Sequence, residues 1–157
     1  FYPEGDDDTT FRRFLDGAAE GFDADAMPLA HIVQHYKAAL ALADQPNVTL
    51  FHYADMARDL PATFARVAEL LGVTYPRGVM ADLINAAPFD HMKANAERYA
   101  PSGGKGFMKS DSDFFHSGTS GKWEGKLTPA QLDAYDYVME GYGLTPEQRH
   151  WLEHGSP

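Results

Sequence analysis

Only one stretch of this chain has the pattern of a strong β-strand, and sequences that favour helix surround it. The segment 48–53, VTLFHY, is rich in β-branched and aromatic residues and is bounded by turn-forming residues. Its mixed apolar character favours burial in a parallel sheet. Because one strand cannot form a sheet alone, either the domain is mostly helical with an isolated strand, or the partner strands belong to sequence outside this chain. The chain begins with Phe1 instead of methionine, which favours the second interpretation.

Helical periodicity accounts for most of the remaining sequence. Apolar residues at helical spacing predict helices over about 11–15, 29–40, 60–71 and 77–86. Gly72 is a predicted C-terminal cap, and Pro88 ends the last of these helices ahead of a turn that runs through Met92. Thr128 and Thr145 each begin a Thr-Pro-x-Gln capping box, which predicts two final helices.

Composition excludes several classes of function. The chain has 157 residues, the size of one domain, with 13 basic and 23 acidic residues and a formal net charge of −10. It has no basic stripe, so nucleic acid and anionic membrane surfaces are not predicted partners. The absence of cysteine excludes disulfides and thiolate metal sites. The sequence has no apolar run near the ~20 residues of a membrane span and no signal peptide, which is compatible with a cytoplasmic location.

The segment 114–123, FFHSGTSGKW, is the strongest candidate for a ligand-binding loop. Gly118 and Gly121 let the backbone turn sharply and come close to a ligand. Neighbouring side chains donate hydrogen bonds to anions: His116 when protonated, Ser117, Thr119 and Lys122. A glycine-bearing surface turn is the competing interpretation. The segment is not a Walker A loop, because His116 and Trp123 occupy positions that require glycine and serine or threonine.

No metal site and no catalytic residue are predicted. His31 and His35 lie one helical turn apart, as do His150 and His154, but neither pair has the adjacent glutamate of a zinc protease helix. Exposed helix faces explain this spacing equally well. The acidic residues of 111–113 fit a solvated loop better than a cation site.

Tyr53, Phe89 and Met92 are candidates for contacts with a nucleotide. Tyr53 closes the predicted strand, and ligands in open α/β sheets bind beyond the carboxyl ends of strands. Phe89 and Met92 can form an apolar wall for a base. Each of these residues has a competing interpretation as a side chain that packs in the protein interior.

Taken in order, these segments resemble the C-terminal half of the PAPS-dependent sulfotransferases, where PAPS is 3′-phosphoadenosine 5′-phosphosulfate. The family has Tyr-(Glu/Ala)-Asp-Met after a strand, then a helix ending in Leu-Gly, then Thr-Ser-Phe-x-x-Met-Lys, and last Phe-(Phe/Met)-Arg-(Lys/Ser)-Gly-x-x-Gly-x-Trp. The matching segments here are YADM at 53–56, LG at 71–72, APFDHMK at 87–93 and FFHSGTSGKW at 114–123. The resemblance covers about 9–142.

The resemblance implies an α/β fold. This chain is then the C-terminal, mostly helical portion of a P-loop-type three-layer sulfotransferase fold, with one parallel-sheet strand at 48–53. Residues 1–157 form part of a single domain whose N-terminal half precedes Phe1. The phosphosulfate loop and the catalytic base are expected in that half, which makes it a partner of this chain and leaves the isolated chain inactive.

The resemblance also implies an activity. The protein is expected to move the sulfuryl group of PAPS to a hydroxyl or amine of a small acceptor, and this chain is expected to supply cofactor-binding residues without a metal. The residues on the adenine side are Tyr53, Ala87, Phe89 and Met92. Those on the 3′-phosphate side are His116, Ser117 and Gly118.

Some positions depart from the family pattern. His116 stands in place of arginine, and Ala87 in place of threonine. Glu124 replaces a lysine that belongs to the dimer motif of animal cytosolic members, which argues against that dimer here and leaves open only a homo-oligomer of another kind. A free histidine, with a pKa near ~6.5, is only partly charged at neutral pH, whereas arginine is always charged. One alternative is therefore a non-catalytic helical interaction module that retains sulfotransferase-like motifs. Another is a different nucleotide-dependent transferase on the same scaffold.

Overall fold

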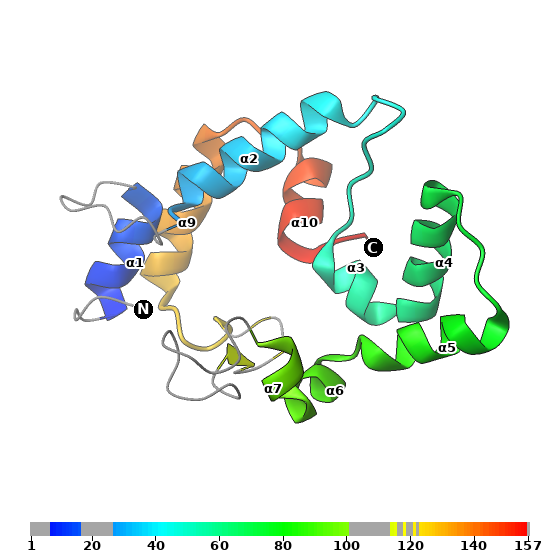
Figure 1. Cartoon of the computed structure of the whole chain (residues 1–157). Helices are drawn as coiled ribbons and strands as arrows, with labels where there is room; N and C mark the ends of the chain where they lie inside the picture. Colours follow the sequence, from blue (N-terminus) through cyan, green and yellow to red (C-terminus); the bar gives the residue numbers. More distant parts are fainter. Residues whose placement is uncertain are drawn as a thin grey trace. The chain divides into compact units, whose positions relative to one another are not determined.

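The computed structural model describes residues 7–16, 27–100, 114–115, 118, 121 and 123–156, and the regular elements within these residues are helices. The predicted helices near 11–15, 29–40, 60–71 and 77–86 are confirmed as α1, α2, α4 and α5. The helices are α1 (Asp7–Asp16), α2 (Leu29–Leu42), α3 (Tyr53–Arg58), α4 (Leu60–Leu71), α5 (Arg77–Ala86), α6 (Phe89–Ala94), α7 (Ala96–Tyr99), α9 (Pro129–Gly141) and α10 (Pro146–His154) (Figure 1).

The chain divides into two compact units. The first unit, Phe1–His52 with Trp123–Pro157, contains α1, α2, α9 and α10. The second unit, Tyr53–Lys122, contains α3 to α7 and the described residues of the glycine-bearing segment except Trp123. All of the predicted nucleotide-binding residues therefore belong to the second unit.

The core of the first unit lies where α1, α2 and α9 meet. Leu15, Leu29, Val33 and Met139 form its buried centre. The apolar stripe along α2 is therefore the face that this helix buries, as its helical spacing predicts. Partly buried side chains surround the centre: Phe11, Phe14, Tyr135, Val138, Tyr142, Leu144 and Leu152.

The C-terminal helix α10 is held in the first unit by aromatic contacts. The ring of Trp151 stacks on Tyr36 of α2, with ring centroids 5.4 Å apart, and meets the ring of His52 edge to face at 5.1 Å. The Nε2 atom of His52 also lies 3.3 Å from the carbonyl oxygen of Leu152. These contacts join α10 to α2 and to the chain just before α3.

Polar side chains join α10 to α9. The Tyr135 hydroxyl and the Arg149 Nε both donate to Glu153 Oε1, at 3.0 and 2.9 Å, and Arg149 also pairs with Asp136. Burial, reinforced by the charge of Glu153, raises the pKa of Tyr135 well above its usual range. Hydrogen bonds to Asp136 and Glu153 raise the pKa of Arg149, which stays charged.

Both predicted capping boxes are confirmed. At the start of α10 the Gln148 backbone N–H donates to the Thr145 hydroxyl at 3.2 Å, and the Thr145 N–H donates to Gln148 Oε1 at 3.0 Å. Thr128 makes the same reciprocal pair at the start of α9. Gly72 caps α4 with a left-handed φ of 64°, as predicted. These helix ends depend on residues close in sequence, which explains why they are predictable.

The strand predicted at 48–53 does not occur in the part of the chain that the structure describes. Residues 48–52 have no regular secondary structure, and Tyr53 begins α3, so the prediction that Tyr53 ends a strand is wrong. Side-chain exposure still alternates from residue to residue over this segment, with the period of an extended chain. A strand needs a neighbour that pairs its backbone N–H and C=O groups, and the described residues provide none. The parallel sheet stays a prediction.

The turn predicted through Met92 is also wrong, because the structure has a helix there. Pro88 is the N-cap of α6, and the Met92 N–H closes its first turn on the Pro88 carbonyl at 3.0 Å. Proline ends α5 because it lacks an N–H, but it is well suited to the start of the next helix.

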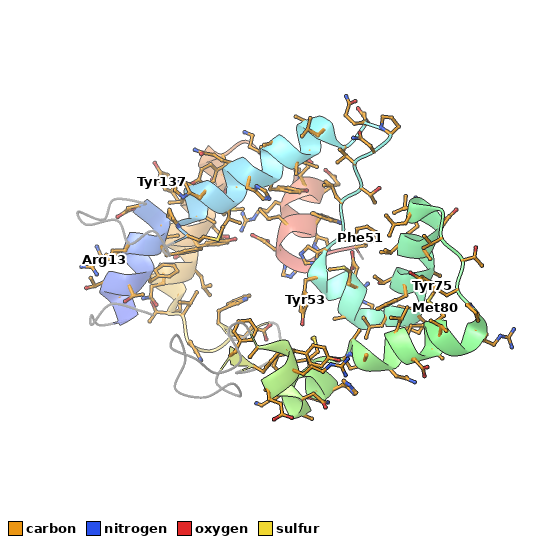
Figure 2. The ribbon with its side chains drawn as sticks, in the orientation of Figure 1. Arg13, Phe51, Tyr53, Tyr75, Met80 and Tyr137 are labelled. Carbon is orange, nitrogen blue, oxygen red and sulfur yellow. The ribbon has the colours of Figure 1, made fainter. Side chains whose placement is uncertain are left out.

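The second unit exposes many apolar side chains along α4, α5 and the loop between them. They are Leu70, Leu71, Val73, Tyr75, Val79 and Leu83, each between 39% and 69% exposed. In the view of Figure 2, Tyr75 and Met80 lie in the angle between α4 and α5. Among the described hydrophobic residues of this unit, only Ala96 and Phe115 are buried.

Candidate functional site

The predicted site residues of the second unit come from the start of α3, the region of α5 and α6, and the glycine-bearing segment. Phe89 is the first residue of α6 and Met92 lies one turn later, and both are half-buried. Ala87, the C-cap of α5, is also half-buried. Phe89 and Met92 therefore share one face of a short helix, as a wall for a base requires.

Phe89 belongs to an aromatic cluster. Its ring meets the ring of Phe115 edge to face, with centroids 5.9 Å apart and planes at 71°. Phe115 in turn meets Phe114 at 5.0 Å and 87°. Edge-to-face contacts are the favoured geometry for aromatic pairs. The cluster joins the segment around 89 to the segment around 114, as a common binding site requires.

Gly118 also packs closely against Phe89. A Cβ atom added to Gly118 would lie 2.5 Å from Cγ of Phe89 and 2.9 Å from its Cβ and Cδ1. Real side chains do not approach this closely, so the position has no room for anything larger than glycine while Phe89 stays in place. The structure therefore brings Phe89 and Gly118, which the sequence predicts for opposite ends of one ligand, into direct contact.

Tyr53 has a more open position. It is 55% exposed, and Figure 2 shows it projecting from the first turn of α3, away from α4. An exposed phenol can stack on a base and donate a hydrogen bond. His116 and Ser117, the other predicted 3′-phosphate residues, lie outside the described residues, as do Lys122 and the acidic residues of 111–113.

Basic residues lie on α6, which carries Phe89, and on α7, which follows it. His91 and Lys93 are in the last turn of α6, and α7 adds Arg98, whose guanidinium lies 5.7 Å from the centre of the Tyr99 ring. The rings of His91 and Tyr99 are 6.4 Å apart. Asp90 on α6 and Glu97 on α7 balance Lys93 and Arg98, so with histidine neutral these two helices carry no net charge.

Sequence reasoning did not single out Phe115 as a site residue. Phe115 is 6% exposed and contacts Phe89 directly. The only signal in the sequence was the doubled phenylalanine before the glycines, and it does not indicate which ring is buried. That distinction depends on the position of α6, far away in sequence.

Other candidate features lie elsewhere. A hollow of about 470 Å³ is lined by Pro146, Glu147, His150, Trp151 and Gly155 in the first unit, and it contains none of the predicted site residues. The His150 and His154 rings are 5.1 Å apart on α10. Within the described ranges, no group of three or more His, Cys, Asp or Glu side chains is placed to hold a metal ion. No described helix is both long and apolar enough to cross a membrane.

Comparison with known proteins gives a consistent result. A family model described as a sulfotransferase domain matches residues 3–151. A glycolipid sulfotransferase of Mycobacterium bovis (strain BCG / Pasteur 1173P2) is 37% identical over 127 residues, which are 81% of this chain and 38% of that protein. Sulfotransferase 2A6 of Rattus norvegicus is 26% identical over 114 residues, which are 73% of this chain and 40% of that protein. The chain thus spans about two fifths of the length of these relatives. No solved structure matches it.

Proposed function

Because the chain belongs to the sulfotransferase family, we propose that it forms the adenine and 3′-phosphate side of a PAPS site. The complete enzyme transfers the sulfuryl group of PAPS to a hydroxyl or amine of a small acceptor. The observation that supports this proposal is the contact between Gly118 and Phe89. Gly118 belongs to the loop assigned to the 3′-phosphate, and Phe89 is assigned to the adenine base, so the contact brings the two proposed binding segments together.

Each residue has a proposed role that fits its chemistry. Phe89 and Met92 offer the adenine an apolar face from α6, and the exposed ring of Tyr53 offers a second aromatic surface. Base stacking on aromatic side chains contributes roughly 1–3 kcal/mol. Ala87, beside Phe89, is small and leaves room for the base.

The 3′-phosphate is assigned to the glycine-bearing loop. Gly118 allows a close approach of the backbone, while His116 and Ser117 are proposed hydrogen-bond donors to the phosphate oxygens. Histidine bears a full charge only when protonated, so this grip is expected to be weaker at neutral pH than one made by arginine.

The reaction needs groups that this chain does not supply. Sulfuryl transfer resembles phosphoryl transfer: the acceptor oxygen bonds to sulfur as the bond from sulfur to the leaving phosphate oxygen breaks, and the enzyme contributes positioning and charge stabilisation. We assign to the present chain the binding and orientation of the nucleotide part of PAPS. The phosphosulfate loop and the base that takes the acceptor proton are assigned to the N-terminal half of the domain.

The exposed apolar face of α4 and α5 supports this division. Soluble proteins rarely leave so large a group of neighbouring apolar side chains uncovered, and the segment 70–83 exposes six of them. We propose that the N-terminal half of the sulfotransferase domain covers this face. The cytoplasmic location and any homo-oligomer stay predictions from the sequence.

The names of relatives suggest an acceptor class to test first. The Mycobacterium bovis relative is named as a glycolipid sulfotransferase. A sugar hydroxyl of a glycolipid has the nucleophile that the proposed transfer needs, so glycolipids are the first acceptors to offer the complete enzyme.

Calorimetry on the full-length protein tests the proposal, with adenosine 3′,5′-bisphosphate (PAP) and AMP as ligands. PAP is expected to bind at least about tenfold more tightly than AMP, because hydrogen bonds to a charged group contribute roughly 1.5–3 kcal/mol. Phe89→Ala is expected to weaken PAP binding about tenfold or more through lost stacking. Tyr137→Ala is the control, since Tyr137 is 79% exposed on α9.

The other outcomes identify the alternatives. No binding at millimolar PAP favours the non-catalytic helical module, which the changes at His116 and Ala87 first suggested. Equal affinity for PAP and AMP favours a different nucleotide-dependent transferase, because only a sulfotransferase site needs the 3′-phosphate.

A further inference from the structure

Phe115 is buried in the second unit, yet the proposed function gives it no role. It is 6% exposed, whereas its neighbour Phe114 is 46% exposed. Large buried side chains are held in one rotamer by close packing. Phe115 is therefore a fixed point within a loop in which Phe114 and Gly118 are exposed and Gly121 is half-buried.

Phe89 is contacted by two residues of this loop. The ring of Phe115 meets it edge to face at 5.9 Å, and the backbone of Gly118 lies so close that a Cβ atom there would be 2.5 Å from Cγ of Phe89. Phe115 and Gly118 are three positions apart in the sequence. A shift of the Phe89 ring would therefore change the space available to the Gly118 backbone.

We infer that Phe115 is a positioning residue for the nucleotide site. It holds the ring of Phe89, and through that ring it sets the separation between the adenine wall and the backbone at Gly118. This inference rests on the proposed function, because it assigns a purpose to the contact between Phe89 and Gly118 on which that proposal is based. Supporting side chains of this kind keep a binding residue within about 0.5 Å of its productive position.

The first test compares matched substitutions in the full-length protein. Phe115→Leu keeps an apolar side chain but removes the ring edge that faces Phe89. Phe64→Leu is the control, because Phe64 is a half-buried phenylalanine on α4 of the same unit. With similar losses in Tm, Phe115→Leu is expected to weaken PAP binding about tenfold and Phe64→Leu less than twofold, since a displaced binding group can lower activity by as much as about 100-fold.

A double-mutant cycle tests whether Phe115 acts through Phe89. In the Phe89→Ala background no ring is left to position, so Phe115→Leu is expected to change PAP affinity less than twofold. Phe115→Met is the conservative variant. A methionine thioether fills a similar space and contacts aromatic edges favourably, so PAP affinity is expected to stay within about threefold of wild type.

The outcomes separate the inference from the proposed function. If the wild-type protein does not bind PAP, both are overturned. If it binds PAP and Phe89→Ala weakens binding, while Phe115→Leu matches Phe64→Leu, only the positioning role is overturned. The positioning role is also overturned if Phe115→Leu weakens PAP binding equally in the wild-type protein and in the Phe89→Ala background. If Phe115→Leu fails to fold, loss of PAP affinity in a folded Phe115→Met protein counts against the role.

Discussion

Gly118 lies against the side chain of a residue distant in the sequence, Phe89. Its nearest neighbour is the ring of Phe89, and a methyl group at this position would overlap three atoms of that side chain. Gly78 differs, because a Cβ atom there would meet nothing within 4 Å. Close packing therefore excludes a larger residue at position 118, whereas it does not exclude one at position 78.

Substitution of these glycines gives opposite expectations. Gly118→Ala is expected to weaken PAP binding by the full-length protein at least about tenfold, because the loop or Phe89 must move away from its place. Gly78→Ala, within α5, is expected to leave binding unchanged and to stabilise the protein by about 0.5–1 kcal/mol. Calorimetry and urea unfolding measure the two effects. Unchanged PAP affinity in Gly118→Ala would contradict the assigned contact.

His116 carries a prediction of pH dependence. If its imidazole meets the 3′-phosphate, PAP affinity rises as pH falls from about 8 to about 6, because a free histidine gains its proton near pH ~6.5. The phosphate itself takes up a proton near pH ~6, so the His116→Arg variant provides the reference. That variant is expected to bind PAP more tightly, and its PAP affinity is expected to lack the change that histidine protonation causes. An identical pH profile in both proteins would remove His116 from the site.

At the scale of the elements, the packing of α10 against α9 depends on a cluster of polar side chains in addition to the helix caps. Tyr135 donates to Glu153, and Arg149 bonds to Glu153 and Asp136. The hydroxyl of Tyr135 must stay protonated to make this contact. Alkaline pH, which removes this proton, is therefore expected to weaken the packing of α10 against α9.

The direction in which folding stability changes with pH follows from the raised pKa of Tyr135. The first cause of this raised pKa is burial. Below pH ~10 tyrosine is neutral in both folded and unfolded chains, and above it only the unfolded chain ionises at this position, so stability falls as pH rises. The slope is at most about 1.4 kcal/mol per pH unit, reduced by solvent screening at this half-exposed site. Unfolding by urea between about pH 8 and about 11 measures it.

Two phenylalanine variants isolate this contribution. Tyr135→Phe is expected to lose part of the alkaline fall in stability, together with about 1 kcal/mol at neutral pH from the lost hydrogen bond. Tyr137→Phe, at a 79% exposed position, is expected to behave as wild type. Burial also raises the pKa of Tyr36, but both variants retain Tyr36 and its contribution cancels. Equal alkaline slopes in the two variants would contradict the prediction.

At the scale of the molecule, the isolated 157 residues are expected to bind PAP weakly and to transfer no sulfate. The chain covers about two fifths of its relatives, and the proposed phosphosulfate loop and base lie outside it. A sulfate-transfer assay with PAPS compares the isolated chain with the full-length protein. Turnover by the isolated chain at enzymatic rates would show that it contains a complete site.

The sequence alone determined the features that depend on near neighbours. Thr128, Thr145 and Gly72 mark helix ends because capping groups reach only a few residues along the chain. The ordered motifs, from Tyr53 to Trp123, were sufficient to identify the family that the comparisons show. The turn at Met92 was predicted wrongly, because proline can begin a helix as readily as it ends one.

Only the tertiary structure decided which distant residues meet. The sequence placed Phe89 and Gly118 in candidate segments, but their contact and the burial of Phe115 depend on how α6 packs against the glycine-bearing loop. The contact of Trp151 with His52 likewise joins residues far apart in the chain. Segment 48–52 has the composition of a strand and no strand partner among the described residues. The physical reason is the same throughout: local preferences act along the chain, whereas packing and strand pairing require a second surface.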